Sequence, residues 1–197
     1  FGIAPKATLN SYTASLIGDT ASDNCAIGWW PRGYSDTSVL IELALNDGVD
    51  VVSISSTYST DRESMRGALA RAITQKVPIV VSMGNDSEYN PPKSLARMTG
   101  VVGVASVEPN GELTSYSNYG DYVSTASVSR PYARSGATWE KGYWQGTSFA
   151  SPTVASFLAL TMQRWPDATG NQVMQDLART GIGGNGGYWN PYTGYGA

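Results

Sequence analysis

Short, continuous apolar runs alternate with segments of helical spacing along the first half of the chain. The apolar runs predict strands at 49–54, 78–83 and 101–107, all rich in β-branched residues. Before and between the first two runs, apolar residues recur every three or four positions, which predicts helices over 35–46 and 60–76. Because the strands are apolar throughout and not at alternate positions, we expect a parallel sheet with both faces covered.

The second half opens on a turn-rich stretch, 108–145, in which we expect surface loops and antiparallel hairpins. Residues 148–164 then predict a helix that is apolar nearly all round, with Pro152 in its first turn. Such a helix belongs in the middle of a domain. An amphipathic helix is predicted over 171–180. Since no repeat or composition break divides the chain, we expect residues 1–197 to form a single α/β domain.

Composition narrows the possible functions. Of the 197 residues, 41% are hydrophobic and 15% charged, which excludes a disordered chain. The net charge is −3, and the 13 lysines and arginines form no basic run. We therefore expect neither nucleic acid nor a membrane as a partner. Cys25 is the only cysteine, so it is either a buried small hydrophobe or half of a bridge to another chain.

The sequence contains no histidine. A mechanism in which this chain by itself supplies an imidazole base, or binds zinc through histidine, is therefore excluded. The chain starts at Phe1 without a signal peptide, from which we expect a mature or trimmed product. Its few charges and many Gly, Ser, Thr and Tyr residues suit a secreted protein.

Residues 146–152 (GTSFASP) place Ser148 at the start of the predicted buried helix, directly after a glycine turn. The start of a helix carries free N–H groups and a partial positive charge. A serine there can be held in one pose while its own backbone N–H points at a developing oxyanion. The alternative is plain N-capping, for which serine is a favoured residue.

A second candidate site follows the strand predicted at 78–83. Gly84 and Asn85 stand where the chain leaves the sheet. Ligands of open parallel sheets gather at these carboxyl ends. Glycine followed by asparagine is also a common turn, which is the alternative.

The heptapeptide closely resembles the nucleophile motif Gly-Thr-Ser-x-Ala-x-Pro of the subtilisin-like serine proteases, the subtilases. Three further segments resemble the family in the same order: 1–7 its Gly-Val-Ala-Pro segment, 50–55 its Asp-Val-Ile-Asn-Met-Ser strand, and 116–120 its Phe-Ser-Asn-x-Gly turn. The resemblance implies a three-layer α/β/α fold with a mainly parallel sheet and a buried central helix after the nucleophile. It also implies a secreted endopeptidase that forms an acyl-enzyme on Ser148, with Asn85 as oxyanion donor.

In subtilases the catalytic Asp and His precede the segment at which this chain begins, so it resembles the C-terminal two-thirds of a catalytic domain. Without a base Ser148 is an ordinary alcohol, and we expect the chain by itself to be inactive. Four explanations stay open: a second chain carries Asp and His, the sequence is truncated, the chain is a peptide-binding pseudoprotease, or it is a sedolisin. Sedolisins pair serine with Glu and Asp but carry an acid at the position of Asn85.

The family binds polypeptide substrate as an extra strand between two edge segments. The resemblance places one wall of the cleft at Ser55, Ser56 and Thr57, and the other at Ser82, Met83 and Gly84. The aromatic stretch 130–145 has no counterpart that matches the family.

No cofactor is required for this chemistry. Subtilases often bind structural calcium, but the chain shows no carboxylate cluster with the spacing of a calcium loop, so no metal ligand is assigned.

Overall fold

The computed structural model describes residues 2–12, 37–56, 63–134, 139–181 and 188–197. The helices are α1 (Thr37–Asn46), α2 (Glu63–Thr74), the short 3-10 helix η1 (Leu95–Arg97), α3 (Thr147–Arg164) and α4 (Gly170–Thr180). The strands are β1 (Val52–Ile54), β2 (Ile79–Ser82), β3 (Val101–Val107), β4 (Thr125–Val128), β5 (Tyr132–Arg134) and β6 (Lys141–Tyr143).

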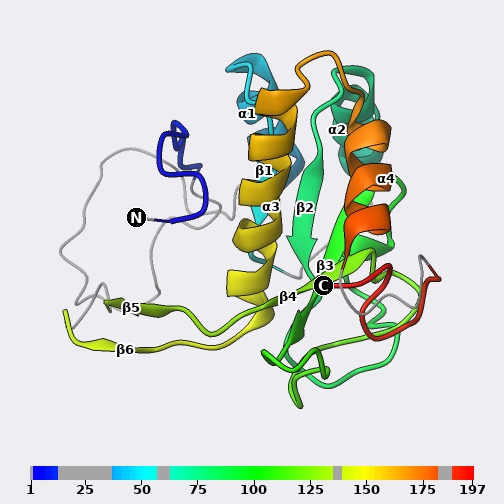
Figure 1. Cartoon of the computed structure of the whole chain (residues 1–197). Helices are drawn as coiled ribbons and strands as arrows, with labels where there is room; N and C mark the ends of the chain where they lie inside the picture. The colour runs from blue at the N-terminus through cyan, green and yellow to red at the C-terminus, as the bar shows by residue number, and fades with distance from the viewer. Residues whose placement is uncertain (1, 13–36, 57–62, 135–138, 182–187) are drawn as a thin grey trace, which may run out of the picture.

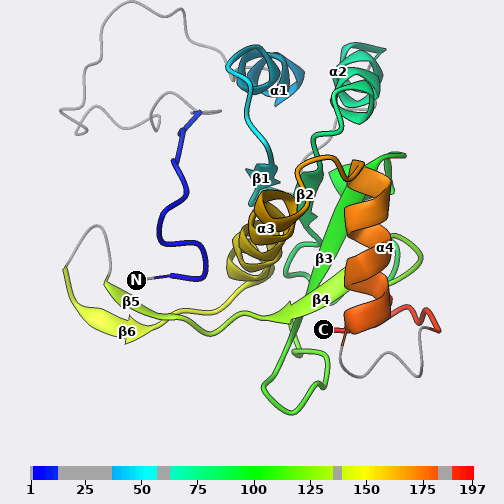
Figure 2. The ribbon, with the colours of Figure 1, turned by 45° about the horizontal axis from the view of Figure 1, so that its top comes forward.

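A four-stranded parallel sheet, in the order β1-β2-β3-β4, forms the centre of the fold (Figure 1). Helices α1 and α2 cover one face, and α3 and α4 cover the other (Figure 2). The three predicted strands, the four predicted helices and the parallel sheet are confirmed within the described ranges, whereas the predicted helix starts at 35–36 and 60–62 lie outside them. The arrangement agrees with the three-layer α/β/α architecture.

The continuous apolar run of β2 is explained by its two neighbouring layers. Ile79 and Val81 pack with the core residues of α1 and α2, whereas Val80 packs with those of α3 and α4. All three side chains are fully buried. Burying each of them contributes about 1.5–3 kcal/mol. Successive side chains of a strand point to opposite faces, so a strand between two helical layers needs an apolar residue at every position.

Two elements are less buried than the sequence predicts. Among the described strands β1 lies at the edge of the sheet, so Val52 and Ile54 are only half-buried. Helix α3 packs on the sheet through a face that includes Val154 and Leu158, but Phe157, at the flank of this face, is 50% exposed. The described residues thus cover the helix that follows Ser148 on its sheet side.

The turn-rich stretch contains one strand that the sequence did not predict. β4 pairs in parallel with β3, and Thr125 and Ala126 at its start are buried. β5 and β6 form an antiparallel hairpin, which confirms the hairpin expected there. This hairpin leads directly into α3.

Candidate active site

The candidate residues of three separate segments meet at the carboxyl ends of β1 and β2. Ser55 directly follows β1 in the chain, Asn85 lies three residues beyond β2, and Ser148 lies in the first turn of α3. Gly146, with φ +139°, turns the chain into the helix through a conformation that residues with a side chain rarely adopt. The local sequence and the parallel sheet therefore bring these residues together.

Ser148 is held against the end of β1. The Ser55 hydroxyl donates to the backbone carbonyl of Ser148 at 2.7 Å, and the Ser148 hydroxyl makes a long, 3.5 Å contact to the Ser55 carbonyl. One turn further, the buried Ser151 hydroxyl donates to the Val80 carbonyl at 3.3 Å. These contacts fix the first turn of α3 on the sheet and leave the Ser148 hydroxyl without a strong partner among the described residues.

Thr147 fixes the orientation of the Asn85 carboxamide. Asn85 Oδ1 accepts from the Thr147 backbone N–H at 2.9 Å and from its hydroxyl at 3.0 Å. The same hydroxyl accepts from the Gly84 N–H at 3.1 Å. Because Oδ1 is occupied by two donors, the Nδ2 amide, which only donates, is directed away from Thr147. The exposed Asn85 side chain therefore keeps a donor group available beside the first turn of α3.

Asn118 shapes the loop that carries Asn85, although no role was predicted for it. Its buried Oδ1 accepts from the N–H groups of Asp86 and Glu88, both at 2.9 Å. Its Nδ2 donates to the Met83 carbonyl at 3.0 Å and to Asp86 at 3.3 Å. In the sequence, the signal for this role was the position of Asn118 in segment 116–120, which resembles a family turn.

Tyr116 supports the turn before α3 from behind. Its hydroxyl accepts from the Gly146 N–H at 3.2 Å and shares hydrogen bonds with Ser106 at 3.0 Å and Ser129 at 2.9 Å. Burial raises the pKa of Tyr116, but hydrogen bonds from Ser106, Ser129, Thr114 and the Gly146 N–H outweigh burial, so its pKa is lowered overall. The network fixes the backbone two residues before Ser148.

The two predicted walls of the substrate cleft differ in their exposure to solvent. Ser55 and Ser56 are exposed, whereas Thr57 lies outside the described residues. Ser82 and Met83 are buried, with Met83 in the core, so their side chains cannot contact a substrate. Since Gly84 has no side chain, Asn85 is the first residue after β2 that extends an exposed side chain.

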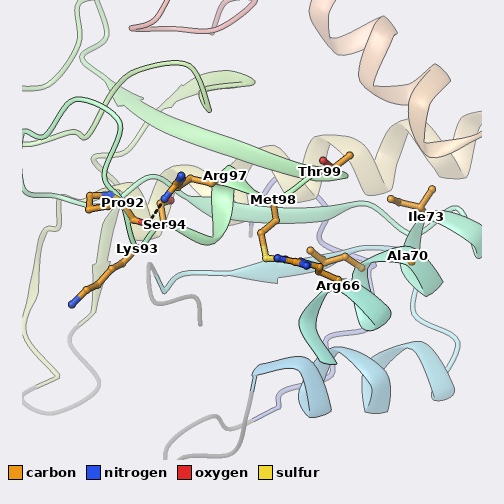
Figure 3. A pocket seen from close by; sticks show the side chains of 10 residues that line it. Arg66, Ala70, Ile73, Pro92, Lys93, Ser94, Arg97, Met98 and Thr99 are labelled. Carbon is orange, nitrogen blue, oxygen red and sulfur yellow. Dashed lines mark hydrogen bonds between the residues drawn. The ribbon is translucent and has the colours of Figure 1, made fainter. Parts of the chain in front are cut away.

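A separate hollow of about 530 Å³ lies between α2 and residues 92–99 (Figure 3). It is lined in part by Arg66, Lys93 and Arg97. The Arg97 guanidinium donates to the Pro92 carbonyl at 2.5 Å and lies 5.4 Å from the centre of the Tyr122 ring. None of the candidate site residues lines this hollow.

The described ranges contain neither a cluster of metal ligands nor a membrane-spanning helix. No group of three or more His, Cys, Asp or Glu residues in them is placed to hold a metal ion. None of the helices in the described ranges is both long and apolar enough to cross a membrane.

Comparisons with curated proteins identify relatives among bacterial proteases. The chain is 29% identical over 184 residues to the thermostable alkaline protease of Halalkalibacterium halodurans, covering 91% of this chain and 46% of that protein. It is 29% identical over 142 residues to the minor extracellular protease Epr of Bacillus subtilis, covering 71% of this chain and 22% of Epr. The chain thus spans less than half the length of these two relatives.

Solved structures show the same fold. MycP1 from Mycobacterium smegmatis superimposes with a TM-score of 0.68 at 24% identity, covering 81% of this chain and 51% of that one. A protease from Pseudoalteromonas arctica superimposes with a TM-score of 0.65 at 25% identity, covering 84% of this chain and 57% of that one. The model of the subtilase family matches residues 1–196. The chain therefore belongs to the subtilase family of serine proteases.

Proposed function

We propose that this chain carries the nucleophile and the oxyanion donors of a secreted subtilisin-like endopeptidase. In the proposed reaction the Ser148 hydroxyl attacks a peptide carbonyl, an acyl ester forms, and water hydrolyses it. The observation that carries this proposal is the junction of Ser148 with Asn85, in which the Thr147 N–H and hydroxyl both hold Asn85 Oδ1. A capping serine alone would not need an oriented amide beside it.

Two donors support the assignment of an oxyanion hole. Ser148 lies in the first turn of α3, where backbone N–H groups have no partner within the helix and the helix dipole is positive. Asn85 Nδ2 is the second donor, because Oδ1 is already occupied. Removing the corresponding donor of a subtilisin costs about 10²–10³ in kcat.

The base is proposed to come from outside this chain. The sequence has no histidine, and the Ser148 hydroxyl makes only the 3.5 Å contact to Ser55 within the described ranges. Activation of a serine requires an adjacent base, itself oriented by an acid. A segment or second chain that carries Asp and His would supply both.

Exposed apolar residues indicate where such a segment would dock. The outer edge of β1 pairs with none of the described strands, which leaves it open to a further strand. Val39 and Leu43 of α1 and Phe157 of α3, on the two faces of the sheet, are exposed. We propose that the segment carrying Asp and His adds to this edge and covers these side chains. No metal is needed for the chemistry. We assign any structural calcium site to that segment.

The substrate is proposed to be a polypeptide bound in extended form. Ser55 and Ser56 are exposed at the end of β1, beside Ser148, where a peptide could pair through its backbone. Secretion is proposed because a relative, Epr, is described as extracellular.

A second candidate is a pseudoprotease that binds peptides without cutting them. The absence of histidine favours it, since the exposed end of β1 needs no base to bind a peptide. Family membership favours both candidates over a sedolisin.

Labelling with a fluorophosphonate separates the two candidates. The native preparation is labelled, denatured and resolved by mass, with Ser148→Ala and Ser156→Ala as matched serine variants of α3. If the chain belongs to an endopeptidase, we expect labelling on Ser148 that is lost in S148A but not in S156A. We also expect a histidine-bearing chain in the same sample. Absence of labelling, while trypsin reacts normally, would refute the endopeptidase and leave the peptide-binding module.

A further inference from the structure

The β5–β6 hairpin presents a face of unusual composition directly before α3. Tyr132 lies opposite Tyr143, and Arg134 lies opposite Lys141. Because these pairs are two residues apart along each strand, all four side chains lie on the same face of the hairpin. The pair between them, Ala133 and Gly142, places only small groups on the other face. We call the four residues Tyr132, Arg134, Lys141 and Tyr143 the cationic hairpin face.

The two cations of this face are not paired with a carboxylate within the described ranges. Neither Arg134 nor Lys141 forms an ion pair there, whereas Arg130 just before the hairpin lies 3.6 Å from Glu108. Like charges directly opposite each other on two strands destabilise the pairing. An anion placed between them would convert this repulsion into two attractive contacts.

The tyrosines provide an apolar platform beside the charges. Their ring centroids are 5.0 Å apart at an angle of 59°, and Tyr132 and Tyr143 are 61% and 72% exposed. In both views the hairpin extends away from the sheet past the start of α3 (Figures 1 and 2). Exposed rings next to paired cations can pack on the stem of an acidic side chain while the cations bind its carboxylate.

We propose that the cationic hairpin face binds acidic side chains of the polypeptide substrate at positions flanking the cleaved bond. This inference rests on the proposed function, which makes a polypeptide the ligand. Lys141 is seven residues from Ser148, so the two are at most about 25 Å apart along an extended chain. An extended substrate of about eight residues spans that distance. The site would therefore select substrates with Glu or Asp several residues from the scissile bond.

Peptide binding to the native preparation tests the inference. The probes are a fluorescent peptide of about twelve residues with three consecutive glutamates near one end and its glutamine counterpart. Fluorescence anisotropy is measured at low salt and at about 0.5 M salt, where the Debye length falls to about 4 Å. The hairpin variant Arg134→Gln/Lys141→Gln is compared with the control variant Lys76→Gln/Arg164→Gln. Both remove two positive charges, and Arg164 lies at the opposite end of α3 from Ser148.

The wild type and the control variant are expected to bind the glutamate peptide at low salt, with affinity lost at high salt. The hairpin variant is expected to bind it about tenfold more weakly. Equal binding by both variants, or equal binding of the glutamate and glutamine peptides, would overturn the inference. Displacement of the peptide by polyphosphate but not by excess unlabelled glutamate peptide would also overturn it.

Labelling of Ser148 distinguishes a failure of this inference from a failure of the proposed function. If the hairpin variant is labelled normally in the native preparation and still binds the glutamate peptide, only the hairpin inference fails. If the glutamate peptide binds through the hairpin but Ser148 is never labelled, the proposed function fails, and with it the claim that the bound peptide is a substrate.

Discussion

Replacing Thr147 with valine tests the geometry of the site through one hydroxyl group. Thr147 is fully buried, and its hydroxyl both accepts from the Gly84 N–H at 3.1 Å and donates to Asn85 Oδ1 at 3.0 Å. Valine has nearly the same shape, so packing is kept while both hydrogen bonds are lost. The buried Gly84 N–H then has no partner, at a cost of about 1–3 kcal/mol, and the lost bond to Asn85 adds about 1 kcal/mol.

We expect Thr147→Val to lower the free energy of unfolding by about 3 kcal/mol. With a slope of about 2 kcal/mol/M, the midpoint of urea unfolding falls by about 1.5 M. The assay follows tryptophan fluorescence in urea and compares T147V with Thr153→Val. Among the described residues the Thr153 hydroxyl bonds only to the Phe149 carbonyl, one turn earlier in α3. We therefore expect T153V to change the free energy of unfolding by less than about 0.5 kcal/mol.

Orientation of Asn85 has a separate readout. In T147V the Asn85 carboxamide keeps only the Thr147 N–H, so we expect labelling of Ser148 in the native preparation to slow about tenfold. Thr147→Ser retains the hydroxyl and should restore the labelling rate. If T147V matches T153V in both urea midpoint and labelling rate, the hydroxyl does not hold the site together, and the reasoning is refuted.

Three further substitutions probe the supports of the site. Tyr116→Phe leaves the Gly146 N–H unpaired and should cost about 1–2 kcal/mol in urea unfolding. Because the pKa of Tyr116 is lowered below its usual 10, the wild type should gain stability as pH rises towards 10. Loss of this gain in Y116F would confirm that it comes from Tyr116, whereas an unchanged pH profile of stability would contradict this. Asn118→Ala removes the acceptor shared by the N–H groups of Asp86 and Glu88 and should lower the free energy of unfolding by about 3 kcal/mol. A Tm equal to that of the wild type would show that the loop after β2 does not need Asn118 for its conformation. Gly146→Ala forces a side chain into φ +139° and should cost at least about 1 kcal/mol, measured as the urea midpoint; a neutral effect would exclude strain at this turn.

Where the chain's own pattern determines an element, the sequence predicted it correctly. β2 and β3 are apolar at nearly every position because helices cover both faces of the sheet, and this signal is local. β4 reads Thr-Ala-Ser-Val, which is no stronger than the loops around it, and its pairing with β3 makes it a strand. The burial of β1 was overestimated because the residues of the strand do not show which edge it occupies.

The residues of the site likewise divide into those with a local sequence signal and those whose roles depend on distant contacts. Ser148 and Asn85 were found because each lies in a short segment that resembles a family motif. The roles of Thr147, Asn118 and Tyr116 depend on partners 30 to 63 residues away, such as the Thr147 hydroxyl and the Gly84 N–H. No periodicity or spacing encodes such a contact. Only the fold shows which hydroxyl meets which amide.

The central claim is that Ser148 forms the acyl ester during peptide cleavage. Acid quenching of the native preparation during turnover of an activated ester substrate, followed by peptide mass mapping, measures this directly. The account predicts an acyl adduct on the peptide that contains Ser148, absent from S148A and from the isolated 197-residue chain, which has no histidine. A preparation that cleaves the substrate with its adduct on another residue, or an isolated chain that acylates as fast as the native preparation, would contradict the account.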